Sequence, residues 1–228
     1  MIHGDFTEFK ETTGADPFTL QNKKLLKVFL QYGPVKARIG SMVAYQGDAT
    51  FSHGGSGGAM GFLKSKVTGE GVPVMDVQGS GEVFFANQAA DIQVMYLDND
   101  SIWVNGANVL AFSASIGYDI KAIGGAGAMA GGMYNVVLTG TGYVAITCDG
   151  PPVVLDVSGA PTFADPQAVV MWTSGVQMGV KSDVNLKTLM GKGSGETFQM
   201  SFGGQGWVMV QPSEGVAQGS GSKTGLGF

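Results

Sequence analysis

Few residues of this chain could carry out covalent chemistry. The sequence has a single cysteine, Cys148, and two histidines, His3 and His53. A nucleophilic cysteine needs a nearby base and an electropositive setting, whereas Asp149 follows Cys148 directly and no histidine is close in the sequence. The sequence therefore predicts that Cys148 is a small buried apolar side chain and not a nucleophile.

A resident metal ion is not expected either. Metal sites of β-barrel enzymes commonly use two or three histidines with a carboxylate on facing strands, and Asp48 with His53 is the nearest such combination here. One cysteine also excludes a disulfide framework and a multi-cysteine metal site. We expect no cofactor and no metal.

Two other motifs have a chemical interpretation and a structural one. Residues 98–100 read Asp-Asn-Asp between two strand-like runs, which predicts a turn more than a calcium or acid–base site. The dipeptide pattern G-x-G occurs three times, but strand-like sequence follows each copy, whereas a phosphate-binding loop leads into a helix. No catalytic set emerges, so the sequence predicts that the protein is not an enzyme.

The three G-x-G motifs belong to a longer recurring phrase. Valine follows the second glycine by two residues in every copy, and apolar residues alternate on both sides of the glycines. Alternation with a period of two predicts a strand, a tight turn and a second strand, that is, a hairpin. The three copies contain Gly79, Gly81 and Val83; Gly140, Gly142 and Val144; and Gly204, Gly206 and Val208.

A second phrase lies about 30 residues before each G-x-G, with three apolar residues and then Tyr45, Phe112 or Trp172. The unit therefore occurs three times, as a solenoid or as a closed structure. We favour a closed all-β domain over residues 20–212, with three internal repeats, pseudo-three-fold symmetry and little helix. Residues 1–19 would form a polar N-terminal segment and residues 213–228 a flexible Gly/Ser-rich tail.

Composition limits the partners. Only 14% of the 228 residues are charged and the net charge is −5, with 13 Lys and Arg in total, which argues against nucleic acid as a partner. The first residues lack the features of a signal peptide, and no apolar run is long enough to span a membrane. A cytoplasmic location is expected, and the low charge favours a homo-oligomer, a trimer or a multiple of one.

The connectors between the two recurring phrases suggest an interaction rim. They cover residues 53–66, 121–133 and 184–195, and each combines glycines with a methionine and nearby lysines. Such loops could dock a partner protein, an anionic membrane surface or another subunit; alternatively, the methionines pack inward. The proposed rim residues are Met60, Lys64, Met129, Met190 and Lys192.

Several stretches resemble a known family. The stretches VKARIGSMVAYQG, VNGANVLAFSASIGYDI, TGEGVPVMDVQGSGEVFFANQ and GKGSGETFQMSFGGQGWVMVQPSEG are similar to bacterial proteins of the altered-inheritance-of-mitochondria family, which is related to a mitochondrial biogenesis factor. The resemblance runs over about residues 20–214, and its most specific part extends from Gly195 and Glu196 to Gln211. It implies a double-stranded β-helix like that of the tryptophan RNA-binding attenuation protein, often assembled as homo-oligomers, and it implies no catalytic residues.

Two classes of function remain open. The first is a non-enzymatic, self-assembling interaction or scaffold protein. The second is a small-molecule-binding protein or an enzyme that uses the interior of the β-helix. The recurring inward-type positions are nearly all apolar, which favours the first, because a ligand site needs convergent polar side chains.

Overall fold

A computed structural model describes residues 3–52, 73–122, 134–182 and 198–213. The prediction of an all-β protein is confirmed, because the helices among the described residues are three short 3-10 turns, Thr7–Phe9, Leu30–Tyr32 and Gly106–Asn108. The strands are β1 (Phe18–Asn22), β2 (Leu25–Phe29), β3 (Val35–Arg38), β4 (Met42–Gln46), β5 (Ala49–Ser52), β6 (Val74–Gly79), β7 (Glu82–Phe85), β8 (Asp91–Asn105), β9 (Val109–Ser113), β10 (Gly117–Ala122), β11 (Tyr134–Cys148), β12 (Val153–Asp156), β13 (Thr162–Ala164), β14 (Val169–Thr173), β15 (Val176–Ser182), β16 (Phe198–Gly204) and β17 (Trp207–Val210).

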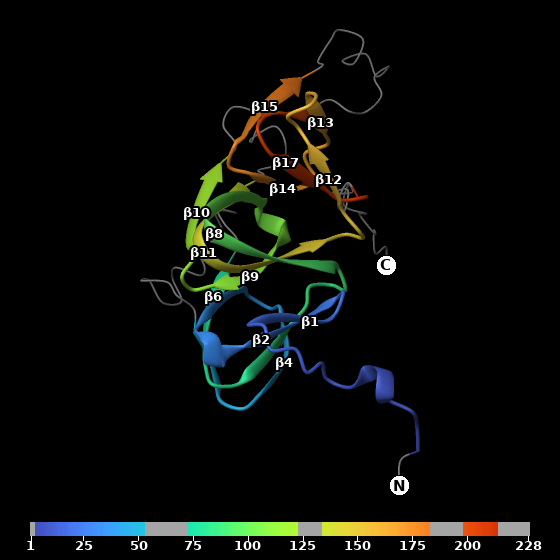
Figure 1. Ribbon diagram of the computed structural model, residues 1–228, viewed down its shortest axis with the longest axis vertical. Helices are drawn as coiled ribbons and strands as arrows, with labels where there is room; N and C mark the ends of the chain where they lie inside the picture. The colour runs from blue at the N-terminus through green and yellow to red at the C-terminus, as the bar shows by residue number, and fades with distance from the viewer. Residues whose placement is uncertain (1–2, 53–72, 123–133, 183–197, 214–228) are drawn as a thin grey trace, which may run out of the picture.

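The described strands form three antiparallel sheets. A four-stranded sheet has the order β1-β2-β7-β4, and a three-stranded sheet has the order β13-β16-β15. The largest sheet has ten strands in the order β12-β17-β14-β8-β11-β9-β3-β6-β5, with β10 paired to β11 beside this path. In Figure 1 the first strands lie at one end of the long axis and β13 and β15 at the other.

Alternation of apolar and polar residues explains the shorter strands. In β3, Val35 and Ala37 are buried, while Lys36 between them points to the other face and pairs with Asp76. Successive side chains of a strand point to opposite faces, so this pattern buries one face and leaves the other partly in water. β9 and β14 are buried on both faces over most of their length, which fits their apolar runs.

The G-x-G motifs are corners, and the hairpin prediction is wrong. β6 pairs with β3 and β5, whereas β7 pairs with β2 and β4, so the strands on either side of Gly79 enter different sheets. β16 and β17 separate in the same way, and β11 continues through Gly140 and Gly142 with a shift in register. The first and third copies therefore mark a place where the chain passes from one sheet to another, and the middle copy marks the place where β11 exchanges β10 for β9 as its neighbour within one sheet.

Close packing explains the glycine at the corner. Gly79 has φ +144°, a conformation that disfavours a side chain. A Cβ there would lie 2.0 Å from the backbone oxygen of Asp48. The loop between β4 and β5 thus crosses directly over this residue, and only glycine leaves room for it.

The predicted turn at residues 98–100 is also wrong. β8 runs without interruption from Asp91 to Asn105, and Asp100 lies opposite Gly140 while Leu97 lies opposite Gly142, with a register shift between the two pairs. Asn99 adopts a positive φ of 50°, and its backbone N–H donates to Thr141 Oγ1 over 2.9 Å. The register shift between β8 and β11 is a bulge, so turn-forming residues are accommodated here inside a long strand.

In the described part of the chain, the core consists of three apolar clusters. The first is centred on Leu26, Val83 and Phe85, next to the four-stranded sheet. The second surrounds Val104, Phe112 and Val144, and the third surrounds Trp172, Phe202 and Val208. Each G-x-G valine is therefore part of a different cluster.

Candidate functional site

The predicted interaction rim lies outside the described residues. Met60, Lys64, Met129, Met190 and Lys192 all fall in segments that the structure leaves undescribed, so the rim stays a prediction. Of the lysines near them, Lys121 is described, and its Nζ lies 2.6 Å from a carboxylate oxygen of Asp119.

Cys148 is a buried core residue, as expected. It ends β11, is completely buried and forms part of the second apolar cluster. Burial raises the pKa of its thiol to about 12, with further contributions from the negative charges of Asp91 and Asp149. A thiol with this pKa is protonated at neutral pH and does not act as a nucleophile.

Carboxylates do not assemble into a metal site in the described part of the chain. Within these ranges, no three or more His, Cys, Asp or Glu side chains lie together in a way that could hold an ion. Asp48 lies in the loop that crosses Gly79, and His53 falls outside the described residues. Asp100 accepts hydrogen bonds from the backbone N–H of Ser101 and from the hydroxyl of Ser174.

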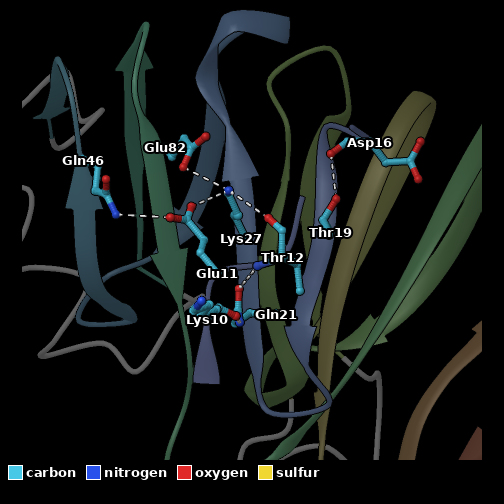
Figure 2. Close-up of polar contacts among 9 residues, drawn as sticks. All are labelled: Lys10, Glu11, Thr12, Asp16, Thr19, Gln21, Lys27, Gln46 and Glu82. Carbon is cyan, nitrogen blue, oxygen red and sulfur yellow. Dashed lines mark hydrogen bonds and ion pairs between the residues drawn. The ribbon is translucent and has the colours of Figure 1, made fainter. Parts of the chain in front are cut away.

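The most unusual charged group is a buried lysine on the four-stranded sheet. Lys27 of β2 is only 3% exposed, because residues of the N-terminal segment lie across it (Figure 2). Its Nζ forms an ion pair with Glu11 and lies 3.0 Å from Glu82 Oε2 of β7. The backbone oxygen of Thr12 is a further acceptor at 3.4 Å.

Three further contacts hold the N-terminal segment in place (Figure 2). The Gln21 side chain of β1 accepts from the backbone N–H of Thr12 over 2.8 Å and donates to the backbone oxygen of Lys10 over 2.9 Å. On the opposite side, Gln46 of β4 donates to Glu11 over 3.4 Å. Residues 10–12 therefore bridge the sheet from β1 to β4.

The electrostatics of this cluster indicate a structural role. Burial by itself would lower the pKa of Lys27, but the carboxylates of Glu11 and Glu82 outweigh it and raise the pKa. The hydrogen bond from Lys27 correspondingly lowers the pKa of Glu11. Lysines that act as nucleophiles or bases need a lowered pKa, so the raised pKa of Lys27 favours a structural role in which it holds the N-terminal segment on the sheet.

A second buried polar group joins the end of β17 to the middle of the chain. Gln211 Oε1 accepts from Asn108 Nδ2 over 3.3 Å and from the backbone N–H of Asp149 over 3.0 Å. Asn108 also donates to the backbone oxygen of Thr147 over 2.7 Å. Because buried polar groups must be hydrogen-bonded, this network fixes the position of the C-terminal strand.

The remaining candidate is a set of exposed apolar strand edges. All five residues of β4 are exposed, and among the described strands β4 pairs with β7 on one side only. β13 likewise ends the three-stranded sheet and exposes Phe163, and β12 ends the ten-stranded sheet with Val153 and Val154 exposed. Exposed apolar edge strands are places where another strand can add.

Comparison with known families decides the classification. A family model described as "Mitochondrial biogenesis AIM24" matches residues 18–213, most of the chain. The chain belongs to the AIM24 family. This agrees with the resemblance seen in the sequence. The match begins at the first residue of β1 and ends at the last described residue.

Solved structures support the fold of this AIM24-family chain. Seven chains of known structure are similar to it. One is protein SPYM3_0169 from Streptococcus pyogenes, with a TM-score of 0.70 and 20% identity over 86% of this chain and 92% of that chain. At this identity the likeness concerns the fold. The comparison with curated proteins finds no match. Among the described residues, no helix has the length and hydropathy needed to cross a membrane.

The residues that stand out in the structure carry little signal in the sequence. In the sequence, Lys27 looks like the polar residue of an alternating strand, and nothing in the sequence predicts its ion pair with Glu11. Gln211 stands out only as the end of the family motif. For the exposed edges a signal existed, since β4 and β13 contain no Asp, Glu, Lys or Arg. Edge strands normally carry such charges.

Proposed function

We propose that this AIM24-family protein is a non-enzymatic, self-assembling interaction or scaffold protein, built from three internal repeats with a double-stranded β-helix-like fold. The observation that carries the proposal is the exposed apolar strand β4, with Met42, Val43 and Tyr45 on an open sheet edge. Soluble proteins rarely leave such an edge uncovered, because it invites pairing with another chain.

Strand pairing supports the repeats. In the first part of the chain β7 lies between β2 and β4, while β6 lies between β3 and β5. The last part pairs in the same way, with β17 between β12 and β14 and β16 between β13 and β15. In the middle part the two halves of β8 and of β11 take the corresponding places, together with β9 and β10.

Register supports the repeats as well. The recurring aromatic residue is paired with the recurring valine in every part, as Tyr45 with Val83, Phe112 with Val144 and Trp172 with Val208. Each of the three strands that carry the aromatic also has a register shift two residues before it, at Val43, Leu110 and Val170.

The interior favours a scaffold over a ligand-binding protein. The largest fully buried side chains are all apolar, among them Trp172, Phe85 and Phe202. A site for a small molecule needs several polar groups that converge on a cavity. Lys27 and Gln211, two of the buried polar side chains, have partners from the chain itself, whereas Asn135 Nδ2 is buried without a hydrogen-bond partner.

Mass measurement in solution tests this proposal. We expect native mass spectrometry and light scattering, over a concentration series from about 1 to 100 μM, to give a multiple of the 23.5 kDa chain mass. A monomer at every concentration would refute self-assembly. A bound molecule of discrete mass that survives purification would favour the ligand-binding alternative.

A further inference from the structure

The outer face of the four-stranded sheet carries a polar site between two aromatic rings. Lys27 of β2 is opposite Phe84 of β7, and Phe29 of β2 is opposite Glu82 of β7. Directly opposed residues of neighbouring strands share a face, and successive residues alternate between faces. Val28, between Lys27 and Phe29, belongs to the first apolar cluster. The other four residues therefore lie together on the face that points away from this cluster.

The ammonium group of Lys27 is the centre of this site. Its Nζ lies 4.3 Å from the centroid of the Phe29 ring and 5.9 Å from that of the Phe84 ring. Glu82 Oε2 is 3.0 Å away, and an ammonium group has three hydrogens to donate. Two of them are thus left for acceptors that do not come from the sheet.

Residues 10–12 fill the site (Figure 2). Lys27 binds the carboxylate of Glu11 and the backbone oxygen of Thr12. Gln21 of β1 accepts from the backbone N–H of Thr12 and donates to the backbone oxygen of Lys10, where the backbone is extended. Backbone hydrogen bonds are available to any residue type, whereas the ammonium group favours a carboxylate. The site therefore fits an extended chain with one acidic side chain.

The segment that fills the site is weakly held. Among residues 10–16 only Thr12 is half-buried and the rest are exposed, including Ala15, their single apolar residue besides glycine. Segments with few buried apolar contacts open locally at little cost in free energy. The family match also begins only at Phe18. The site thus belongs to the matched domain, whereas its occupant lies outside the match.

The fit of the segment is imperfect. Thr12 Oγ1 is buried and has no hydrogen-bond partner among the described residues, and the contact of Gln46 Nε2 with Glu11 Oε2 is long, at 3.4 Å. A buried hydroxyl without a partner costs free energy. A segment with an apolar residue in place of Thr12 would therefore bind the same face more tightly.

We propose that the outer face of the four-stranded sheet binds an acidic peptide segment of a partner protein, and that residues 10–12 occupy the site until it arrives. A glutamate or aspartate of the partner takes the place of Glu11 on Lys27, and the partner backbone takes over the hydrogen bonds to Gln21. The N-terminal segment competes with the partner, so the apparent affinity depends on the fraction of chains whose site is open. The site lies on a sheet face and not on a strand edge, so the inference goes beyond self-assembly and does not depend on it.

Peptide binding to the full chain tests the proposal. The probe is a fluorescently labelled peptide that copies residues 8–16, and binding is followed by fluorescence anisotropy. Glu11→Lys should detach the segment, because it places a second positive charge beside Lys27, and this variant should bind the probe at least about tenfold more tightly than the wild type. Glu8→Lys makes the same charge change at an exposed residue of the turn Thr7–Phe9 and should bind like the wild type.

Three further changes, all measured with Glu11→Lys protein, show which contacts hold the probe. A probe with Glu11→Gln should bind about tenfold more weakly, because it loses the charge that pairs with Lys27. A probe with Thr12→Val should bind about fivefold more tightly, since it no longer buries an unpartnered hydroxyl. Adding Gln21→Ala to the protein should weaken binding of the unchanged probe by about tenfold.

Hydrogen exchange tests the opening of the segment in the unchanged protein. The backbone N–H of Thr12 donates to Gln21, and that of buried Leu30 donates to the backbone oxygen of Gly81 over 2.9 Å. If the segment detaches by itself, the Thr12 N–H should exchange at least about a hundredfold faster than the Leu30 N–H. Equal rates would mean that the segment leaves the sheet only when the protein unfolds, and they would overturn the proposal.

The outcomes keep this inference separate from the proposed function. Glu11→Lys protein that binds the probe no better than Glu8→Lys protein would refute the site, and so would equal binding of the Glu11→Gln probe. Light scattering on the same samples reports the oligomeric state. An oligomer without probe binding would refute the acidic-segment site and leave self-assembly standing, whereas probe binding by a monomer would support the site and refute self-assembly.

Discussion

A corner can require glycine because of a positive φ or because of close packing. Substitution of glycine by alanine at three positions separates these two requirements. Gly79 combines φ +144° with a space so tight that a Cβ would lie 2.0 Å from the backbone oxygen of Asp48. Gly33 has a similar φ of +131°, but a Cβ added there would meet nothing within 4 Å. Gly203, inside β16, has neither a positive φ nor a neighbour within that distance.

These differences give expected magnitudes. Gly33→Ala should lower the free energy of unfolding by about 1–3 kcal/mol, the cost of an unfavourable backbone conformation. Gly79→Ala adds about 1–3 kcal/mol for displacing the crossing backbone, which gives a total of about 2–6 kcal/mol. Gly203→Ala should be neutral or stabilise the protein by up to about 1 kcal/mol, because alanine restricts the unfolded chain.

Urea unfolding followed by tryptophan fluorescence, at one fixed protein concentration, measures all three variants. The predicted order of stability is Gly203→Ala, then Gly33→Ala, then Gly79→Ala. If Gly79→Ala were as stable as Gly33→Ala, the close crossing at Asp48 would not exist. If Gly203→Ala were as damaging as Gly79→Ala, space and φ would not be what selects glycine in these strands.

Three further predictions concern the buried polar groups and the thiol. Lys27→Met should lower stability by about 1–3 kcal/mol, because its partners are only partly buried and regain water, with Lys10→Met as an exposed control. The folded pKa of Glu11 is lowered, so the stability that its ion pair with Lys27 contributes is complete above the unfolded pKa of about 4.3 and is lost as the pH falls through the folded pKa. The wild type should therefore lose more stability than Lys27→Met in urea titrations between about pH 5 and pH 3. Equal losses would contradict the ion pair. Gln211→Ala should cost about 1–3 kcal/mol by leaving the Asn108 side chain and the Asp149 N–H short of a partner, whereas Gln205→Ala, at an exposed corner, should be neutral in the same assay. Cys148, with a pKa of about 12, should react with a thiol reagent at pH 8 only as fast as the protein unfolds, and fast modification of the folded protein would contradict its burial.

The sequence predicted the strands better than their partners. Alternation around Gly79, Gly140 and Gly204 located strands on both sides, because side-chain periodicity is a local property. Whether those strands pair with each other depends on φ and on what crosses the glycine, and a hairpin and a corner need the same residue type. The Asp-Asn-Asp stretch failed for a related reason, since residues that form turns also form bulges.

The candidate sites were less predictable than the fold. Glu11 and Lys27 are 16 residues apart, and their contact exists only because residues 10–12 cross the sheet, which no local pattern records. Gln211 meets Asn108 across 103 positions of the chain. The exposed edges needed a comparison between matching positions, since Val43 and Tyr45 look like ordinary strand residues until Leu110 and Phe112 are seen to be buried.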